Sequence, residues 1–145
     1  MIYLVHHADA VGPDVEPQRP LSTAGRAHAE ALAIDAARRG VKPAVIWHSG
    51  KLRARQTAEP FLRLCNPLAE FSAIRGLQPD DPPGWVRDRV SGENREVMLV
   101  GHMPNLPRVL TLLVRGDESS LLSFPLHGAI ALEAVGEHWV ERWQL

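Results

Sequence analysis

Two short segments, far apart in the chain, place histidine where an apolar run gives way to a turn. His6 and His7 follow the first apolar run, and His102 follows a much later one. Such runs predict strands, and α/β proteins keep their chemical groups at the carboxyl ends of parallel strands. Between these segments, Arg53 lies at the start of a predicted helix. Two histidines and an arginine in such positions indicate phosphoryl transfer through a phosphorylated histidine.

A neutral imidazole can attack phosphorus and hold the phosphoryl group until water removes it, which divides one difficult displacement into two easier steps. We expect His7 to be this nucleophile. The equatorial oxygens of the phosphoryl group carry charge in the transition state and need hydrogen-bond donors. The planar guanidinium of Arg53 suits this role, and His102 can donate a further hydrogen bond to the same oxygens. These groups can act together only if the strands that precede them end side by side.

The elements that position these groups are predicted from the pattern of apolar residues. Residues 2–6, 44–48 and 96–100 are apolar without polar alternation, which is typical of strands covered on both faces of a parallel sheet. Helices are predicted from Ser22 to Gly40 and over residues 50–64, 85–90 and 105–114, with a further strand near residues 68–71 and a hairpin of residues 129–135 and 138–143.

Alternating strands and helices followed by a hairpin predict an α/β fold. We expect a three-layer α/β/α sandwich whose mostly parallel central sheet ends in a C-terminal antiparallel hairpin. The chain of 145 residues, with 45% hydrophobic residues, is the size of one ordinary domain, so residues 1–145 are expected to form a single domain.

Composition narrows the classes of partner. The chain has 16 basic and 17 acidic residues, so we expect neither nucleic acid nor a membrane as a partner. The only cysteine, Cys65, excludes an internal disulfide and fits a cytoplasmic location. The apolar start of the chain, residues 1–5, is too short for a signal peptide or a membrane span.

Four segments in order resemble the histidine phosphatase superfamily, which has the phosphoglycerate mutase-like fold. More narrowly, they are similar to its short phosphohistidine phosphatase branch typified by bacterial SixA. The segments are His6-His7-Ala8-Asp9-Ala10, Arg19-Pro20-Leu21-Ser22-Thr23-Ala24-Gly25, Ser49-Gly50-Lys51-Leu52-Arg53-Ala54-Arg55-Gln56-Thr57 and Gly101-His102-Met103-Pro104.

This resemblance implies roles for individual residues. It implies that His7 is the nucleophile, that Arg53 and His102 bind phosphate, and that Arg19 acts on the substrate side of the site. It also implies a reaction without metal or organic cofactor, with a phosphorylated protein or a small phosphoramidate as substrate and inorganic phosphate as product.

The chain departs from the family pattern at the first motif. Family members usually have Arg-His-Gly there, whereas this chain has His6, His7 and Ala8. Loss of one charge-assisted hydrogen bond costs about 1.5–3 kcal/mol, which is roughly a tenfold to hundredfold loss of affinity. We expect His6 to replace the arginine in part by becoming protonated beside the bound dianion, so that phosphate affinity falls as pH rises through neutrality.

The residue that protonates the leaving group does not match a motif. Asp80 and Asp81 are candidates for a general acid or for the pocket rim, and His127, in a loop before the hairpin, is a candidate for the rim. A phosphohistidine substrate needs less acid catalysis, because imidazole is a far better leaving group than an alkoxide. This favours hydrolysis of phosphohistidine on a protein or of a small phosphoramidate.

A metal site is the main rival hypothesis that composition allows, because imidazole and carboxylate groups are suitable ligands. No pair of them has the i, i+4 spacing of ligands on one helix, and Arg53 would repel a nearby cation. Two further hypotheses stay open: a phosphomonoesterase, or a non-catalytic module that binds phosphate or a phosphoprotein and lacks the first-motif arginine. The possible metal ligands are His6, His7, Asp9, His48 and His102.

Overall fold

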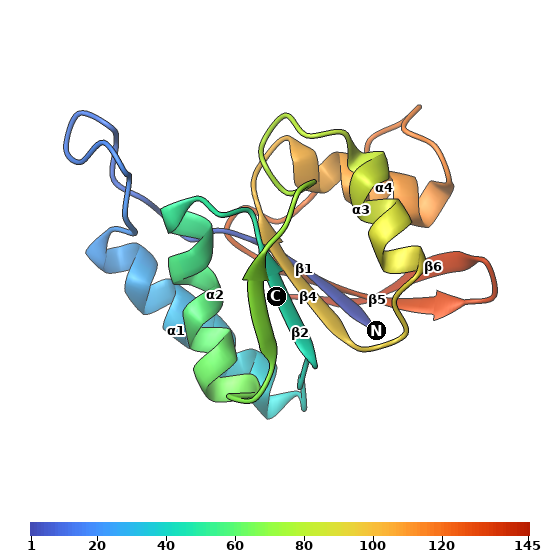
Figure 1. Cartoon of the computed structure of the whole chain (residues 1–145), viewed down its shortest axis with the longest axis horizontal. Coiled ribbons are helices and arrows are strands. Elements are labelled where there is room, and N and C mark those ends of the chain that lie inside the picture. Colours follow the sequence, from blue (N-terminus) through green and yellow to red (C-terminus); the bar gives the residue numbers. More distant parts are fainter.

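The computed structural model describes residues 1–145 and contains one sheet of six strands in the order β3-β2-β4-β1-β5-β6 (Figure 1). The strands β1 to β4 pair in parallel with one another, whereas β5 is antiparallel to both β1 and β6. The strands are β1 (Ile2–His6), β2 (Val45–His48), β3 (Glu70–Ala73), β4 (Val97–Gly101), β5 (Ala129–Val135) and β6 (His138–Gln144).

Helices cover both faces of the sheet, with α1 and α2 on one face and α3 and α4 on the other (Figure 1). The predicted three-layer α/β/α sandwich with an antiparallel C-terminal hairpin is therefore confirmed. No helix has both the length and the apolar character needed to cross a membrane. The helices are α1 (Thr23–Arg38), α2 (Leu52–Cys65), α3 (Pro83–Ser91) and α4 (Asn105–Arg115).

The central strands are apolar throughout because both of their faces are covered. Leu4 and Leu99 lie in the apolar layer beneath α3 and α4, whereas Val5 and Val100 lie in the layer beneath α1 and α2. All four side chains are fully buried. Burial of each side chain of this kind contributes about 1.5–3 kcal/mol, so the strands beneath the histidine motifs form a rigid base.

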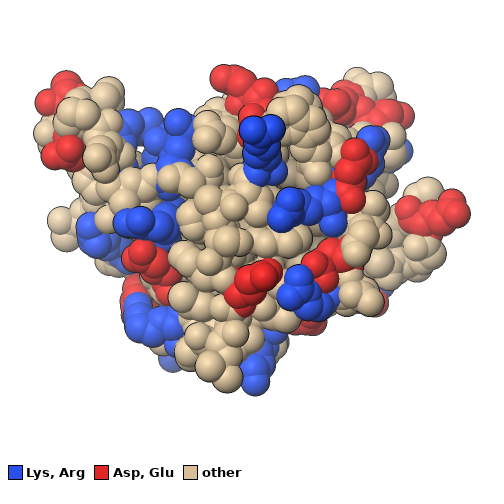
Figure 2. Space-filling model, viewed as in Figure 1, with Lys and Arg blue, Asp and Glu red and all other residues tan.

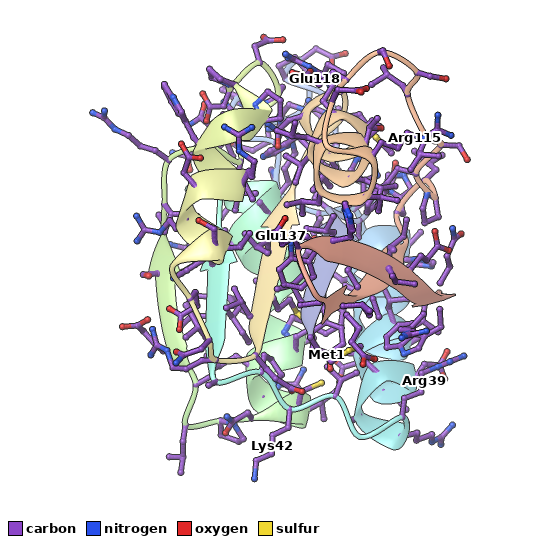
Figure 3. All side chains as sticks on the ribbon, turned by 90° about the vertical axis from the view of Figure 1, so that its right-hand side faces the viewer. Met1, Arg39, Lys42, Arg115, Glu118 and Glu137 are labelled. Carbon is purple, nitrogen blue, oxygen red and sulfur yellow. The ribbon has the colours of Figure 1, made fainter.

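Three neighbouring parallel strands end at the same edge of the sheet. His6 at the end of β1 is paired with Gly101 at the end of β4, and His48 at the end of β2 is paired with the residue before Gly101. Met1 and Lys42 lie at the opposite end, where strands begin (Figure 3). The turns after β1, β2 and β4 therefore meet at one edge, as a shared site requires.

The start of α1 is fixed against the loop that follows β1. The hydroxyl of Ser22 accepts a hydrogen bond from the N–H of Gly25 (3.0 Å) and donates one to the Asp9 carboxylate (2.7 Å). A Cβ at Gly25 would lie 2.0 Å from the Asp9 carbonyl oxygen, so this close packing requires glycine. The N–H of Leu21 donates to the Gln56 side chain (2.8 Å), which ties the same loop to α2.

Two of the element boundaries that differ from the sequence prediction have a clear physical reason. The third strand begins at Glu70, because the side chain of Asn66 accepts a hydrogen bond from the N–H of Leu68 and holds a turn there. Leu68 is accordingly 94% exposed. Helix α3 begins at Pro83, two residues before the predicted start, because the fixed φ of proline suits a first helical turn.

The surface carries charges of both signs. Figure 2 shows Lys and Arg side chains interspersed with Asp and Glu side chains over the face seen in Figure 1. Many of them form exposed ion pairs, such as Arg108 with Glu118 and Arg142 with Glu133. Each such pair contributes only about 0–1 kcal/mol. This face therefore presents no extended field of one sign.

Candidate active site

The turns at the carboxyl ends of the strands bring together histidines from distant parts of the chain. The ring centroids of His6 and His7 are 4.5 Å apart, and those of His7 and His102 are 4.9 Å apart. The N–H of His7 donates to the carbonyl oxygen of Gly101 (3.0 Å), so the two turns are joined directly. This edge of the sheet therefore carries a cluster of imidazoles from β1 and β4.

The ring of His7 is held in one orientation and in one tautomer. Its Nδ1 donates to the carbonyl oxygen of Ala8 (2.7 Å), which leaves the lone pair on Nε2. Burial lowers the pKa of His7 to about 4, with further lowering by Arg53 and Arg19, although the Ala8 hydrogen bond opposes this shift. His7 is thus neutral at pH 7, and its Nε2 has a free lone pair.

The loop of His7 is anchored to the start of α2 through a buried hydroxyl. Thr57 is fully buried, and its hydroxyl oxygen accepts a hydrogen bond from the N–H of Ala8 (2.9 Å). The same hydroxyl donates to the carbonyl oxygen of Arg53 (2.8 Å), one turn earlier in α2. These two bonds set the position of Arg53 relative to the nucleophile.

Arg53 has no carboxylate partner. The nearby arginine Arg55 pairs with Glu59, whereas the Nε of Arg53 is buried without a hydrogen-bond partner. Burial, followed by the positive charge of Arg19, lowers the pKa of Arg53 from its usual value, yet a guanidinium remains cationic in proteins. A half-buried cation with a buried, unpartnered donor is a group that an anion would stabilise.

His102 is fixed by a serine that sequence reasoning did not assign. The ring Nε2 lies 2.6 Å from the hydroxyl of Ser49, which already accepts a hydrogen bond from the N–H of Lys51 (3.2 Å). The hydroxyl keeps its proton available for Nε2 of His102, and with Ser49 as the donor the neutral ring carries its own proton on Nδ1. This Nδ1 is buried without a partner, as is the Nε of Arg53. Both groups lack a partner, and the charge of Arg53 acts on His102.

The pKa of His102 is lowered to about 3, mainly by burial and then by His7 and Arg53. The ring is therefore neutral at pH 7 and acts as a donor through Nδ1. Ser49 belongs to the segment that starts with Ser49 and contains Arg53. Its position in that segment could have marked Ser49 as a site residue. Nothing in the sequence, however, indicated that its hydroxyl contacts His102.

His6 is also held as a neutral ring. Its Nδ1 accepts a hydrogen bond from the backbone N–H of His127 (2.8 Å), so the ring proton lies on Nε2. Burial, followed by His7 and His127, lowers the pKa of His6 to about 3. In the structure His6 is neutral, because the loop donates to the atom that would have to take up the proton; its protonation beside a bound dianion stays a prediction. His6 offers one neutral N–H donor.

His127 lies over His6 in the loop before β5. The two rings are stacked, with centroids 4.9 Å apart and an interplanar angle of 5°. The Nδ1 of His127 donates to the carbonyl oxygen of His7 (2.7 Å). The structure thus brings His127 into direct contact with both histidines of the first motif.

Arg19 lies in the long loop between β1 and α1. Its Nε donates to the carbonyl oxygen of Val11 (3.0 Å), and its φ of 52° is in the left-handed region. Its charge lowers the pKa values of His7 and Arg53, so it lies within electrostatic range of both groups. The other nitrogens of its guanidinium make no hydrogen bond to protein.

The two aspartates predicted as candidates for an acid lie in the loop before α3. The carboxylate of Asp81 accepts hydrogen bonds from the N–H groups of Gly76 and Gln78, each 3.0 Å long. Asp80 is exposed and makes neither a side-chain hydrogen bond nor an ion pair. The Asp81 carboxylate is therefore occupied in holding its own loop.

The cluster of His6, His7 and His127 suits an anion better than a cation. One ring nitrogen from each residue lies within 4.8 Å of the others, as in a potential metal site. However, the rings of His6 and His127 are parallel, so their in-plane lone pairs do not converge on one point. The Nε2 of His6 carries a proton, and the Arg53 charge acts on this cluster. The donors therefore favour a phosphate-like group.

Comparison with known proteins identifies the class to which this site belongs. Residues 2–78 match the family model of the histidine phosphatase superfamily (branch 1). This match spans just over half of the 145 residues, and the chain belongs to the histidine phosphatase superfamily. The resemblance to this superfamily is therefore confirmed, and the matched range contains the first three of the four sequence segments. A search of curated proteins found no match.

Solved structures with the same fold include SixA phosphohistidine phosphatases. The protein histidine phosphatase SixA in complex with tungstate has a TM-score of 0.86 and 20% identity, over 99% of this chain and 95% of that chain. The Agrobacterium tumefaciens protein assigned as phosphohistidine phosphatase SixA has a TM-score of 0.80 and 26% identity, over 99% and 96%. A phosphoserine phosphatase mutant from Entamoeba histolytica, in complex with phosphoserine, has a TM-score of 0.72 and 13% identity, over 99% and 95%.

Proposed function

We propose that this protein hydrolyses phosphohistidine, on a protein or in a small phosphoramidate, through a covalent phosphohistidine intermediate on His7. One observation carries the proposal. The Nε2 of His7 is free and neutral, the adjacent His102 has a buried Nδ1 without a partner, and the buried Nε of Arg53, whose charge acts on both rings, is also without a partner. A nucleophile beside donors for equatorial oxygens is what phosphoryl transfer requires.

The reaction has two displacements. In the first, Nε2 of His7 attacks phosphorus, the P–N bond of the substrate breaks, and the leaving imidazole keeps the electron pair. It departs neutral when its other ring nitrogen carries a proton. In the second, water attacks the phosphoryl group on His7, and inorganic phosphate leaves with regeneration of the neutral ring. In both steps, Arg53, His102 and the Nε2–H of His6 donate to the equatorial oxygens, with Arg19 on the substrate side.

The state of the acidic residues supports a substrate with a good leaving group. An alkoxide needs a proton from a general acid, but the Asp81 carboxylate is engaged by its own loop and Asp80 is exposed. A groove of about 440 Å³ opens beside Ser49 and extends to Arg75 and Trp85. Such an open flank leaves room for a protein surface. The SixA relatives are named as histidine phosphatases, which agrees with this substrate class.

A phosphomonoesterase is the second candidate, because the phosphoserine phosphatase shares the fold. We expect phosphate monoesters to be poorer substrates, since no carboxylate is free beside the imidazole cluster. We also propose that the protein acts in the cytoplasm, which agrees with a single, buried, unpaired cysteine at position 65.

The test compares wild type with His7→Ala and with His138→Ala as a matched control. His138 is an exposed histidine at the start of β6. It lies at the opposite end of the sheet from the site, past the first residue of β1. Each protein is assayed on a phosphohistidine protein and on p-nitrophenyl phosphate, with EDTA present. We expect wild type and His138→Ala to release phosphate at equal rates and His7→Ala to lose activity.

A trapping experiment distinguishes an enzyme from a binding module. Acid-free quenching during turnover, followed by mass spectrometry, should show one added phosphoryl group on the peptide that contains His7. A protein that binds phosphate but never forms this adduct is a non-catalytic module. Loss of turnover on chelation would instead support a metal-dependent reaction and would overturn the proposal.

A further inference from the structure

His127 is tied to both His6 and His7, although the proposed reaction gives it no role. Its backbone N–H donates to Nδ1 of His6, and its ring Nδ1 donates to the carbonyl oxygen of His7. Its own carbonyl oxygen accepts a hydrogen bond from Nε2 of His28 on α1 (2.9 Å). Three separate hydrogen bonds therefore fix this one loop residue against the site.

The conformation of His127 is one that side-chain-bearing residues seldom adopt. Its φ is 53°, in the left-handed region, where histidine is enriched relative to most non-glycine residues. The next residue, Gly128, accepts a hydrogen bond from the N–H of His6 (2.9 Å). A Cβ at Gly128 would lie 2.4 Å from the carbonyl oxygen of Leu145, so the loop can approach only with glycine there. Surrounding packing thus holds the loop in place.

The contact with His6 decides where the ring proton lies. A neutral imidazole has one donor nitrogen and one acceptor nitrogen. Because the N–H of His127 occupies Nδ1, the proton is confined to Nε2, and His6 becomes a donor of fixed direction. The parallel ring of His127, 4.9 Å away, holds the plane of the His6 ring. Neither effect needs a positive charge on His6.

We propose that His127 is a positioning residue that makes His6 a fixed, neutral hydrogen-bond donor to the phosphoryl group, in the place where related proteins carry arginine. This inference rests on the phosphate site of the proposed function. It adds that the loss of arginine is compensated by a second imidazole from the loop before β5. His127 acts through His6 and His7 and does not touch the reacting atoms.

The first test reads the tautomer directly. A long-range ¹H–¹⁵N spectrum of the full chain at neutral pH, with His6→Gln to assign the signals, shows which ring nitrogen carries the proton. We expect the proton on Nε2 of His6 in wild type, with and without inorganic phosphate. A proton on Nδ1, or on both nitrogens, would overturn the proposal.

The second test measures whether His127 acts through His6. Inorganic phosphate is titrated into His127→Ala and into His127→Asn, whose amide tolerates the left-handed region and can donate to the His7 carbonyl. Alanine keeps the backbone N–H but loses the side-chain bond to the His7 carbonyl oxygen and disfavours the left-handed conformation, so the N–H is no longer held against His6. We expect about a tenfold rise in Kd for the alanine variant, the loss of roughly one hydrogen bond, and less than about a twofold rise for the asparagine variant.

The same alanine substitution is then made in a His6→Arg background. A guanidinium is always fully protonated and needs no selection of tautomer. We expect His127→Ala to change phosphate Kd by less than about twofold there. An equal tenfold loss in both backgrounds would mean that His127 only stabilises its loop, and the inference would be wrong. Neither test needs turnover, so failure to hydrolyse phosphohistidine would refute the proposed function and leave this inference standing.

Discussion

Acidification should destabilise this fold, because three imidazoles of the site are held neutral. The pKa is lowered to about 3 for His6 and for His102, and to about 4 for His7, in each case mainly by burial. In the unfolded chain these rings have pKa values of about 6.5. Below about pH 6.5 the unfolded chain therefore binds protons on these rings, whereas the folded chain does not. The contribution of these neutral rings to folding stability is fully present above about pH 6.5. It is lost as pH falls toward the folded pKa values of about 3 to 4.

The size of the loss follows from proton linkage. Between pH 7 and pH 5, a ring that titrates only in the unfolded chain removes about 2 kcal/mol from the free energy of unfolding. His6 and His102 are 4% and 1% exposed, so they should show the full effect, whereas the partly exposed ring of His7 should show less. We expect a total loss of about 4–5 kcal/mol, a large part of the roughly 5–15 kcal/mol that stabilises an ordinary domain.

The assay is urea unfolding followed by tryptophan fluorescence, in phosphate-free buffer near pH 7 and near pH 5. His6→Gln removes one titrating ring and should reduce the pH-dependent loss by about 2 kcal/mol. His138→Gln, on the exposed hairpin, is the matched control and should behave as wild type does. Equal stability of the wild type at both pH values would refute the reasoning, and so would a His6→Gln variant with the full wild-type loss.

Three further changes probe the groups that surround the nucleophile. Arg53→Lys replaces the planar guanidinium, which can donate two parallel hydrogen bonds, by a single ammonium group. We expect kcat/KM on a phosphohistidine protein to fall by roughly tenfold to hundredfold. Ser49→Ala leaves Nε2 of His102 without its donor, so phosphate Kd, measured by calorimetry, should rise by about fivefold. Gly25→Ala forces a Cβ against the Asp9 carbonyl oxygen and should lower stability by about 1–3 kcal/mol, measured as a drop in Tm. A wild-type value in any of these measurements would contradict the contact that the variant removes or adds.

The fold could be predicted because its central strands are buried on both faces. The apolar runs that end at His6 and His48, and the run that ends at Gly101, identify parallel strands without any tertiary information. Their meeting at one edge then follows from the parallel arrangement. The strand near residue 70 was harder to place, because its side chains are partly or fully exposed and the Asn66 turn moves its start.

The protonation states within the site could not be predicted, because they depend on single hydrogen bonds across long sequence distances. The N–H of His127 reaches Nδ1 of His6 because His127, in the loop before β5, has a left-handed backbone conformation. The sequence showed the missing arginine but not this donor, so it suggested a protonated His6. Likewise, the Ser49 hydroxyl is a common polar group until the end of β4 places His102 beside it.

The charge of the site connects these protonation states with the choice of substrate. Arg53 and Arg19 supply permanent charge, whereas the imidazoles of His6, His7 and His102 are all neutral. Neutral donors bind a phosphate dianion less tightly than guanidinium groups do, so phosphate product is released more easily. They also stabilise the transition state less, which slows reactions that have a poor leaving group. A phosphohistidine brings its own good leaving group and needs less stabilisation. The set of neutral donors therefore supports the proposal that phosphoramidates are better substrates than phosphate esters.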